Sequence, residues 1–173
     1  MIGKAVEAFD GDVVSAFSGS SKLQRVIEDI LMRRDNGAGK IVFCHFRAEI
    51  DVLARILREQ NMHVKVCDGR TTATVKKKVH EKADVLILQI QSGSEGLNLQ
   101  ENFSEVYFTQ PHWNPCTEDQ AVGRCYRMGQ EKDVKVYKYA MENIAPNIRS
   151  IDEHIQRVQD RKKAIIADII GTV

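Results

Sequence analysis

Long apolar runs, paired cysteines and an excess of one charge are all missing from this sequence, and each absence excludes a class of protein. No apolar run approaches the roughly 18 residues of a membrane-spanning helix, and no signal peptide opens the chain. The 25 Lys and Arg residues balance 24 Asp and Glu residues, so a uniformly basic coat for nucleic acid is excluded, although a local basic surface is not. The four cysteines form no Cys-x-x-Cys pair, which argues against a zinc knuckle or a redox dithiol. We therefore expect reduced thiols in an intracellular protein.

The common nucleotide-binding signatures are missing as well. The sequence contains no G-x-x-x-x-G-K-[ST] loop and no acidic metal-binding motif after a strand, so it does not encode a self-contained P-loop ATPase. It has no G-x-G-x-x-G fingerprint, which disfavours a Rossmann dehydrogenase. The five histidines show no metal-ligand spacing, and we predict no metal site in this chain.

The composition that is present describes a folded domain. The chain has 173 residues, of which 43% are hydrophobic and 28% charged, a balance that suits one globular unit with a short appendage. We assign residues 1–20 to a linker or N-terminal extension, residues 21–149 to the folded lobe, and residues 150–173 to a C-terminal helix that packs on the lobe or braces it.

Short apolar strands alternate with helices along the lobe. The strands are expected at Lys40–Phe46, His63–Cys67, Asp84–Ile90, Glu105–Thr109 and Val134–Ala140, and the helices at 21–31, 48–60, 72–83, 117–127 and 150–171. Three of these helices begin with a capping box: Ser21 with Gln24, Thr117 with Gln120, and Ser150 with Glu153. Nearly continuous apolar strands between helices are typical of a parallel sheet covered on both faces, so the fold class is a three-layer α/β domain.

Polar or glycine-bearing segments follow four of these strands. They are Phe46-Arg47, Asp68-Gly69-Arg70, residues 91–96 and residues 110–115. Ligands of open parallel sheets gather at the carboxyl ends of the strands, so these segments are the first candidates for binding.

The stretch from Gln120 to Gln130 reads Q-A-V-G-R-C-Y-R-M-G-Q. On a helix, Gln120, Arg124 and Arg127 would share one face, and guanidinium groups match phosphate oxygens in a bidentate manner. Two arginines three residues apart are nevertheless common, and taken alone they indicate a solvated surface as readily as a phosphate site.

The complete stretch resembles motif VI of the superfamily 2 helicase-like ATPases, in the Swi/Snf form Q-A-x-x-R-x-x-R-x-G-Q. Neighbouring segments match in order: residues 40–46 resemble motif IV, Asp68-Gly69 the following D-G, residues 92–99 motif V, and Trp113-Asn114-Pro115 the W-N-P that precedes motif VI. The likeness runs from about Ser20 to Gly171. Ser92 and Ser94 depart from the small Ala or Gly usual in motif V.

The resemblance implies a RecA-like second lobe of an ATP-dependent translocase on double-stranded DNA, of the kind that remodels bound proteins. In such an enzyme Arg124 and Arg127 would be arginine fingers, Gln120 would position the attacking water or a first-lobe partner, and Glu95 and Gly96 would approach the nucleotide. ATP would bind between this lobe and an N-terminal RecA-like lobe, which would hold Mg²⁺ and belong to the same chain or a separate one. This chain alone would be inactive.

The resemblance also implies a set of DNA-backbone contacts. They are Ser92, Gly93, Trp113, Asn114, Arg47, Gly69 and Arg70. A lone Trp is more often a core anchor, and strand-end arginines and glycines are more often ordinary turn residues, so these plainer roles stay open. The protein is expected wherever DNA is (nucleus, nucleoid or viral factory), with no membrane partner. The alternatives are a stand-alone, non-catalytic DNA-binding or regulatory half and an unrelated α/β binding domain.

Overall fold

The computed structural model describes residues 21–72, 78–79, 81–91, 97–142 and 149–171. Within these residues five strands form one sheet in the order β2-β3-β1-β4-β5, and every neighbouring pair is parallel. The strands are β1 Gly39–Cys44, β2 Val64–Cys67, β3 Val85–Gln89, β4 Phe103–Phe108 and β5 Lys135–Lys138. The predicted parallel sheet is therefore confirmed, with each expected strand present and its ends shifted by a residue or two.

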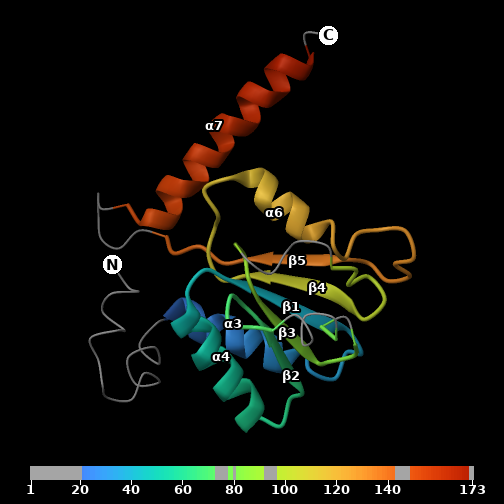
Figure 1. Ribbon diagram of the computed structural model, residues 1–173. Coiled ribbons are helices and arrows are strands. Elements are labelled where there is room, and N and C mark those ends of the chain that lie inside the picture. The colour runs from blue at the N-terminus through green and yellow to red at the C-terminus, as the bar shows by residue number, and fades with distance from the viewer. Residues whose placement is uncertain (1–20, 73–77, 80, 92–96, 143–148, 172–173) are drawn as a thin grey trace.

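The side chains of the central strand alternate between two cores. Val42 and Cys44 of β1 pack with the helices α3 (Ser21–Met32) and α4 (Arg47–Glu59) on one face of the sheet. Ile41 and Phe43 point to the other face, where they share a core with Ala121 of α6 (Pro115–Val122). Because a strand has a side-chain period of two, this strand serves both layers, which explains its continuous apolar run. Figure 1 shows α3 and α4 on one side of the sheet and α6 on the other, so the predicted three-layer fold is confirmed.

The last helix, α7 (Ile151–Gly171), leaves the body of the molecule. Its first half is anchored by Ile155, which is buried, and by the predicted capping box. The Ser150 amide donates to Glu153 Oε2 at 3.0 Å, and the Glu153 amide donates to Ser150 Oγ at 3.1 Å, which confirms that box. Residues 161–168 are all exposed, and Figure 1 shows this part rising away from the sheet. Among the helices that the structure describes, none has the length and apolarity needed to cross a lipid bilayer.

Two predicted helices need correction. The segment 72–83 is not helical at Lys78, Val79 or residues 81–83, which form turns and irregular chain, while residues 73–77 and 80 lie outside the described part. The helix predicted from Thr117 to about Arg127 spans Pro115–Val122 instead. Asn114 caps it by accepting a 3.1 Å hydrogen bond from the Cys116 amide, Pro115 occupies the first turn, and Gly123 ends it.

Strands β1 and β4 mark the point where the chain changes faces. They are hydrogen-bonded neighbours, yet the helix that follows β1 covers one face and the helix that follows β4 covers the other. Connections that diverge in this way leave a crevice at the carboxyl ends of the two strands, the usual ligand position in open α/β sheets. The fold therefore directs attention to the segments after Cys44 and after Phe108.

Candidate functional site

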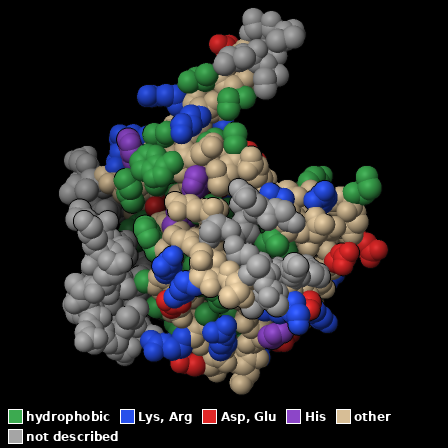
Figure 2. All heavy atoms as spheres, viewed as in Figure 1, with side chains coloured by type: hydrophobic (Ala, Val, Ile, Leu, Met, Phe, Trp, Pro, Cys, Tyr) green, Lys and Arg blue, Asp and Glu red, His purple; other side chains and the backbone are tan. Residues whose placement is uncertain are grey.

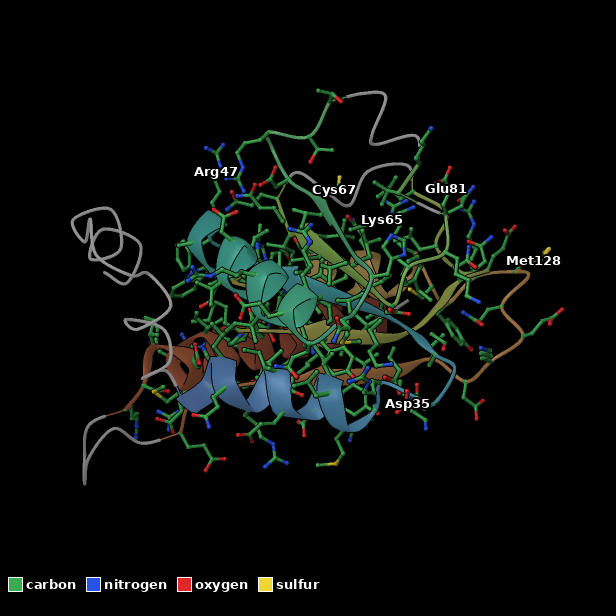
Figure 3. The ribbon with its side chains drawn as sticks, turned by 90° about the horizontal axis from the view of Figure 1, so that it is seen from below. Asp35, Arg47, Lys65, Cys67, Glu81 and Met128 are labelled. Atoms are coloured by element: carbon green, nitrogen blue, oxygen red, sulfur yellow. The ribbon has the colours of Figure 1, made fainter. Side chains whose placement is uncertain are left out.

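Among the described residues, the predicted arginine fingers Arg124 and Arg127 follow the carboxyl end of α6, whereas Trp113 and Asn114 precede its amino end. The helix begins beside the carboxyl end of β4 and, at about 1.5 Å per residue, carries the chain ~12 Å back across the sheet. After the helix, Gln130 Nε2 donates to the carbonyl of Phe103, the first residue of β4, at 2.9 Å. Figure 3 shows Arg47 and Met128 at opposite sides of the molecule. The predicted arginine fingers and the strand-end residues therefore lie in two separate regions of the lobe.

The arginine end is a turn rather than a helix face. Arg124 and Arg127 follow the end of α6, so the prediction that they share one helical face with Gln120 is wrong. Gly123 keeps helical angles (φ −60°, ψ −10°), and Cys125 beyond it is drawn into the core that it shares with Ala121. Gln120 itself remains exposed near the end of α6.

Contacts with residues 98–99 fix this turn. Arg127 Nη1 donates to Asn98 Oδ1 at 2.7 Å, and the Leu99 amide donates to the Arg124 carbonyl at 3.2 Å. Arg124 Nε is buried and has no hydrogen-bond partner among the residues that the structure describes. A buried guanidinium donor left unsatisfied costs roughly 1–3 kcal/mol, so an incoming acceptor would relieve that cost.

Two histidines lie side by side at the carboxyl ends of β1 and β4. The rings of His45 and His112 lie 5.4 Å apart, centroid to centroid, one after each strand. Burial, with a further contribution from His112, lowers the pKa of His45 from 6.5 to about 4, and its Nε2 is buried without a described hydrogen-bond partner. His45 is thus neutral at pH 7 at the carboxyl end of β1.

Arg47 and Gly69 come together at the same edge. A Cβ added at Gly69 would lie 3.3 Å from Arg47 Nη2, so the missing side chain leaves room for the guanidinium. Arg47 is exposed at the first position of α4. The Gly69 amide donates to Gln89 Oε1 at 3.4 Å, and Gln89 in turn donates to the His45 carbonyl. These contacts bind the ends of β1, β2 and β3 into one surface.

Arg70, the third cation predicted at this edge, is held by two carboxylates. Its guanidinium contacts Asp51 at 2.7 Å and Asp68 at 2.6 Å. Hydrogen bonds to Asp51, and then to Asp68, raise the pKa of Arg70 further above its ordinary value. Burial alone would raise the pKa of Asp68, but its hydrogen bonds with Arg70 lower it. The structure thus gives Arg70 two partners within the lobe.

The Trp113 loop, residues 110–114, sits beside this edge and touches α7. Trp113 is 46% exposed, and its ring meets His154 of α7 edge to face with centroids 5.9 Å apart. Its carbonyl accepts a 2.8 Å hydrogen bond from Lys162. The loop is therefore held by α7 on one side while about half of the indole remains open to solvent.

Sequence reasoning missed the two polar groups buried beneath this loop. Glu118 and Gln159 are each only 1% exposed. The His112 amide donates to Glu118 Oε1 at 2.7 Å, and Gln159 Nε2 donates to the same oxygen at 2.7 Å. The available signal was the position of Gln159, four residues after Ile155 and therefore on the buried face of α7.

Several predicted positions cannot be placed. Ser92, Gly93, Glu95 and Gly96, of the segment that resembles motif V, lie outside the described residues. Among the residues that are described, no three His, Cys, Asp or Glu side chains gather in a way that could hold a metal ion.

The described residues form a parallel α/β domain in which the strand-end residues and a fixed arginine turn lie apart. The family described as "Helicase conserved C-terminal domain" matches residues 21–129, which is most of the chain. The chain belongs to this family, and it is related to the Swi/Snf-family ATPases.

Individual relatives agree with this assignment. "DNA repair protein RAD5A" of Arabidopsis thaliana is 29% identical over 165 residues, covering 92% of this chain and 15% of that protein. "DNA repair protein RAD5" of Candida glabrata is 33% identical over 159 residues, covering 84% of this chain and 13% of that protein. The chain thus spans a small part of these relatives' length.

A solved structure shares the fold. It is titled "Crystal structure of the C-terminal part of Fun30 ATPase domain", with a TM-score of 0.67 and 23% identity, covering 82% of this chain and 46% of the other.

Proposed function

We propose that this chain is the second lobe of an ATP-dependent translocase on double-stranded DNA. ATP would be cleaved between it and a first lobe that supplies the phosphate loop and the Mg²⁺ ligands. The two ends of α6 would bind different ligands. The arginine turn faces the nucleotide, and the strand-end surface with Arg47, Gly69 and the Trp113 loop faces the DNA backbone. Closure of the cleft between the two lobes would couple ATP cleavage to movement of the DNA contacts, because α6 rigidly connects the arginine turn to the Trp113 loop.

The observation that carries the proposal is the fixed arginine turn. Arg127 is held by Asn98 yet remains exposed, and Arg124 keeps an unsatisfied donor among the described residues. Surface arginines without a role are normally mobile, and their ion pairs contribute about 0–1 kcal/mol. A guanidinium that is positioned in advance suits the charge that spreads over the γ-phosphate in the transition state, where a finger contributes about 10³–10⁵ in rate.

The residues at the turn fit a phosphate rather than a metal. Guanidinium donors bind phosphate oxygens, and Gln120 adds an exposed amide near the end of α6 that could orient a water. When bound between two lobes, ATP would supply the bond that is cleaved and Mg²⁺ would neutralise its charge.

The test uses the chain joined to a first lobe. Replacement of Arg124 or Arg127 by Ala should each lower kcat by about 10³-fold while DNA affinity changes by only a few-fold. Lysine should not restore turnover, because an ammonium lacks the planar fork of the guanidinium. If both alanine variants keep near-normal turnover, the arginine-finger assignment fails.

The DNA surface is tested separately with the 173-residue chain. Binding to duplex DNA should be weak and independent of sequence, with a log–log salt slope of about −2 to −4 if two to four phosphates are contacted. Trp113→Ala and Arg47→Ala should weaken binding, whereas Arg55→Ala, which removes the same charge from the middle of α4, should do so less.

The second candidate function is a stand-alone DNA-binding or regulatory half that catalyses nothing. It is favoured only by the position of the DNA-facing residues at one end of α6, away from the arginine turn. Restored turnover on addition of a first lobe, lost again in Arg127→Ala, would exclude it.

A further inference from the structure

We infer that α7 positions the Trp113 loop and so sets the grip of this lobe on DNA, with Gln159 and Lys162 as the positioning residues. The DNA half of this inference rests on the function proposed above. The positioning half stands on contacts within the lobe.

Three side chains of α7 reach the loop from one side of the helix. They are His154, Gln159 and Lys162, which at 100° per residue fall within an arc of about 140°. His154 meets the Trp113 ring, and Lys162 holds the Trp113 carbonyl at 2.8 Å. Gln159 donates to the His112 carbonyl next to it and to Glu118. The Trp113 indole and the preceding peptide are thus both fixed by α7.

The three α7 residues His154, Gln159 and Lys162, together called the clamp, are connected to the sheet through Glu118. One carboxylate oxygen accepts from the His112 amide and from Gln159, and the other pairs with Lys138 at the end of β5. Burial alone would raise the pKa of Glu118, but these hydrogen bonds hold it below its ordinary value, so the carboxylate stays charged. A charged group with 1% exposure tolerates little movement of its partners, because each lost hydrogen bond leaves a buried charge unsatisfied.

The exposed C-terminal part of α7 could transmit a force to the clamp. Residues 161–168 are exposed, and Figure 2 shows Lys and Arg side chains along this protruding segment. Any movement of this segment would be transmitted through Lys162 and Gln159 to the loop. Trp113, in turn, is held where half of its indole faces solvent.

The only tryptophan of the sequence makes the clamp measurable without DNA. In Gln159→Leu, acrylamide quenching of Trp113 fluorescence should rise by about twofold, since a released indole would go from 46% exposed to nearly full exposure. Gln156→Leu, the same change at an exposed position of the same helix, is the matched control and should leave quenching unchanged.

A second pair guards against loss of folding. Lys162→Ala and Lys163→Ala each remove one exposed positive charge from α7, but only the former removes the bond to the Trp113 carbonyl. Lys162→Ala should increase quenching with little change in Tm. Lys162→Arg should return quenching to the level of the parent chain, because arginine can also donate to the Trp113 carbonyl. Lys163→Ala should show the quenching of the parent chain.

DNA titration of the same variants completes the test. Gln159→Leu and Lys162→Ala should weaken duplex binding by about threefold to tenfold relative to their controls. Unchanged quenching in both variants would overturn the inference. Increased quenching with unchanged DNA affinity would leave the clamp in place and instead refute the DNA contact assigned to Trp113.

Discussion

At the scale of single residues, His45 makes the stability of the lobe depend on pH. Its pKa is lowered from 6.5 to about 4 by burial and by His112, so the unfolded chain takes up a proton before the folded lobe does. The stability that neutral His45 contributes is complete above about pH 6.5 and is lost as the pH falls toward 4. Between about pH 6.5 and 5.5 the loss should be about 0.5 kcal/mol, discounted because the ring is only partly buried.

The measurement is urea unfolding at several pH values. His45→Gln should flatten the dependence in that window, and His63→Gln, at an exposed position, should not. Burial raises the pKa of Glu49, so its protonation stabilises the fold as the pH falls, opposite in sign to the effect of His45. An identical pH profile in His45→Gln would show that His45 does not cause the pH dependence of the free energy of unfolding.

Asn98 is the residue-scale support of the arginine turn. Its side-chain oxygen accepts the 2.7 Å hydrogen bond from Arg127, so Asn98→Ala should free that guanidinium. In the two-lobe enzyme we expect kcat to fall by about tenfold, less than in Arg127→Ala, because the charge remains while its orientation is lost. Asn98→Asp keeps an acceptor and should retain more activity. Steady-state kinetics with a thermal melt on each variant decide the matter.

At the scale of elements, β1 is fitted closely to the turn that precedes β4. A Cβ at Gly39 would lie 2.0 Å from the Asn102 carbonyl oxygen, a distance that only a backbone shift could relieve. Gly39→Ala should therefore lower the free energy of unfolding by about 1–3 kcal/mol. Gly123→Ala is the contrasting variant: its Cβ would meet its nearest neighbours at 3.4 Å, so stability should be unchanged or slightly higher. Denaturant unfolding of both variants checks the comparison.

The elements also show how far sequence reasoning reaches. Strand β1 was predictable from its continuous apolar run and helix α4 from apolar residues at helical spacing, and Asn61, which takes a left-handed φ of 60° just after the cap Gln60, is a residue type that commonly ends helices. The end of α6 was not predictable, because Gly123 lies in helical conformation yet the helix stops there. What stops it is the burial of Cys125 and the pairing with Leu99, and both are tertiary contacts.

The candidate site was predictable only in part, because tertiary contacts between residues far apart in the sequence shape it. The string of residues 120–130 indicated a phosphate site without its geometry, and the helical face drawn through Arg124 and Arg127 was wrong. The hydrogen bond between Glu118 and Gln159 joins residues 41 positions apart. The spacing of Gln159 from Ile155 indicates that its side chain is buried but not what it contacts, so only the docking of α7 on α6 reveals their partnership.

At the scale of the whole molecule, the proposed function assigns this lobe half of an ATPase site. We expect the 173-residue chain to show no DNA-stimulated ATP hydrolysis above background, because its sequence lacks a phosphate loop and an acidic metal-binding motif. Addition of a first lobe should restore turnover, and Arg127→Ala should abolish the gain. Turnover by the pure chain, confirmed by its loss in Arg127→Ala, would contradict the division of the site between two lobes.

The order of the strands also bears on how the chain is made. β1 lies at the centre of the sheet, but its neighbours β3 and β4 end at Gln89 and Phe108, so its second edge is covered only 64 residues after Cys44. At about 5–20 residues per second, a ribosome would need roughly 3–13 s to complete that interval. Throughout this interval the apolar strand β1 has an edge open to pairing with another nascent chain. Slow synthesis should therefore favour aggregation, and early binding by a chaperone should raise the yield.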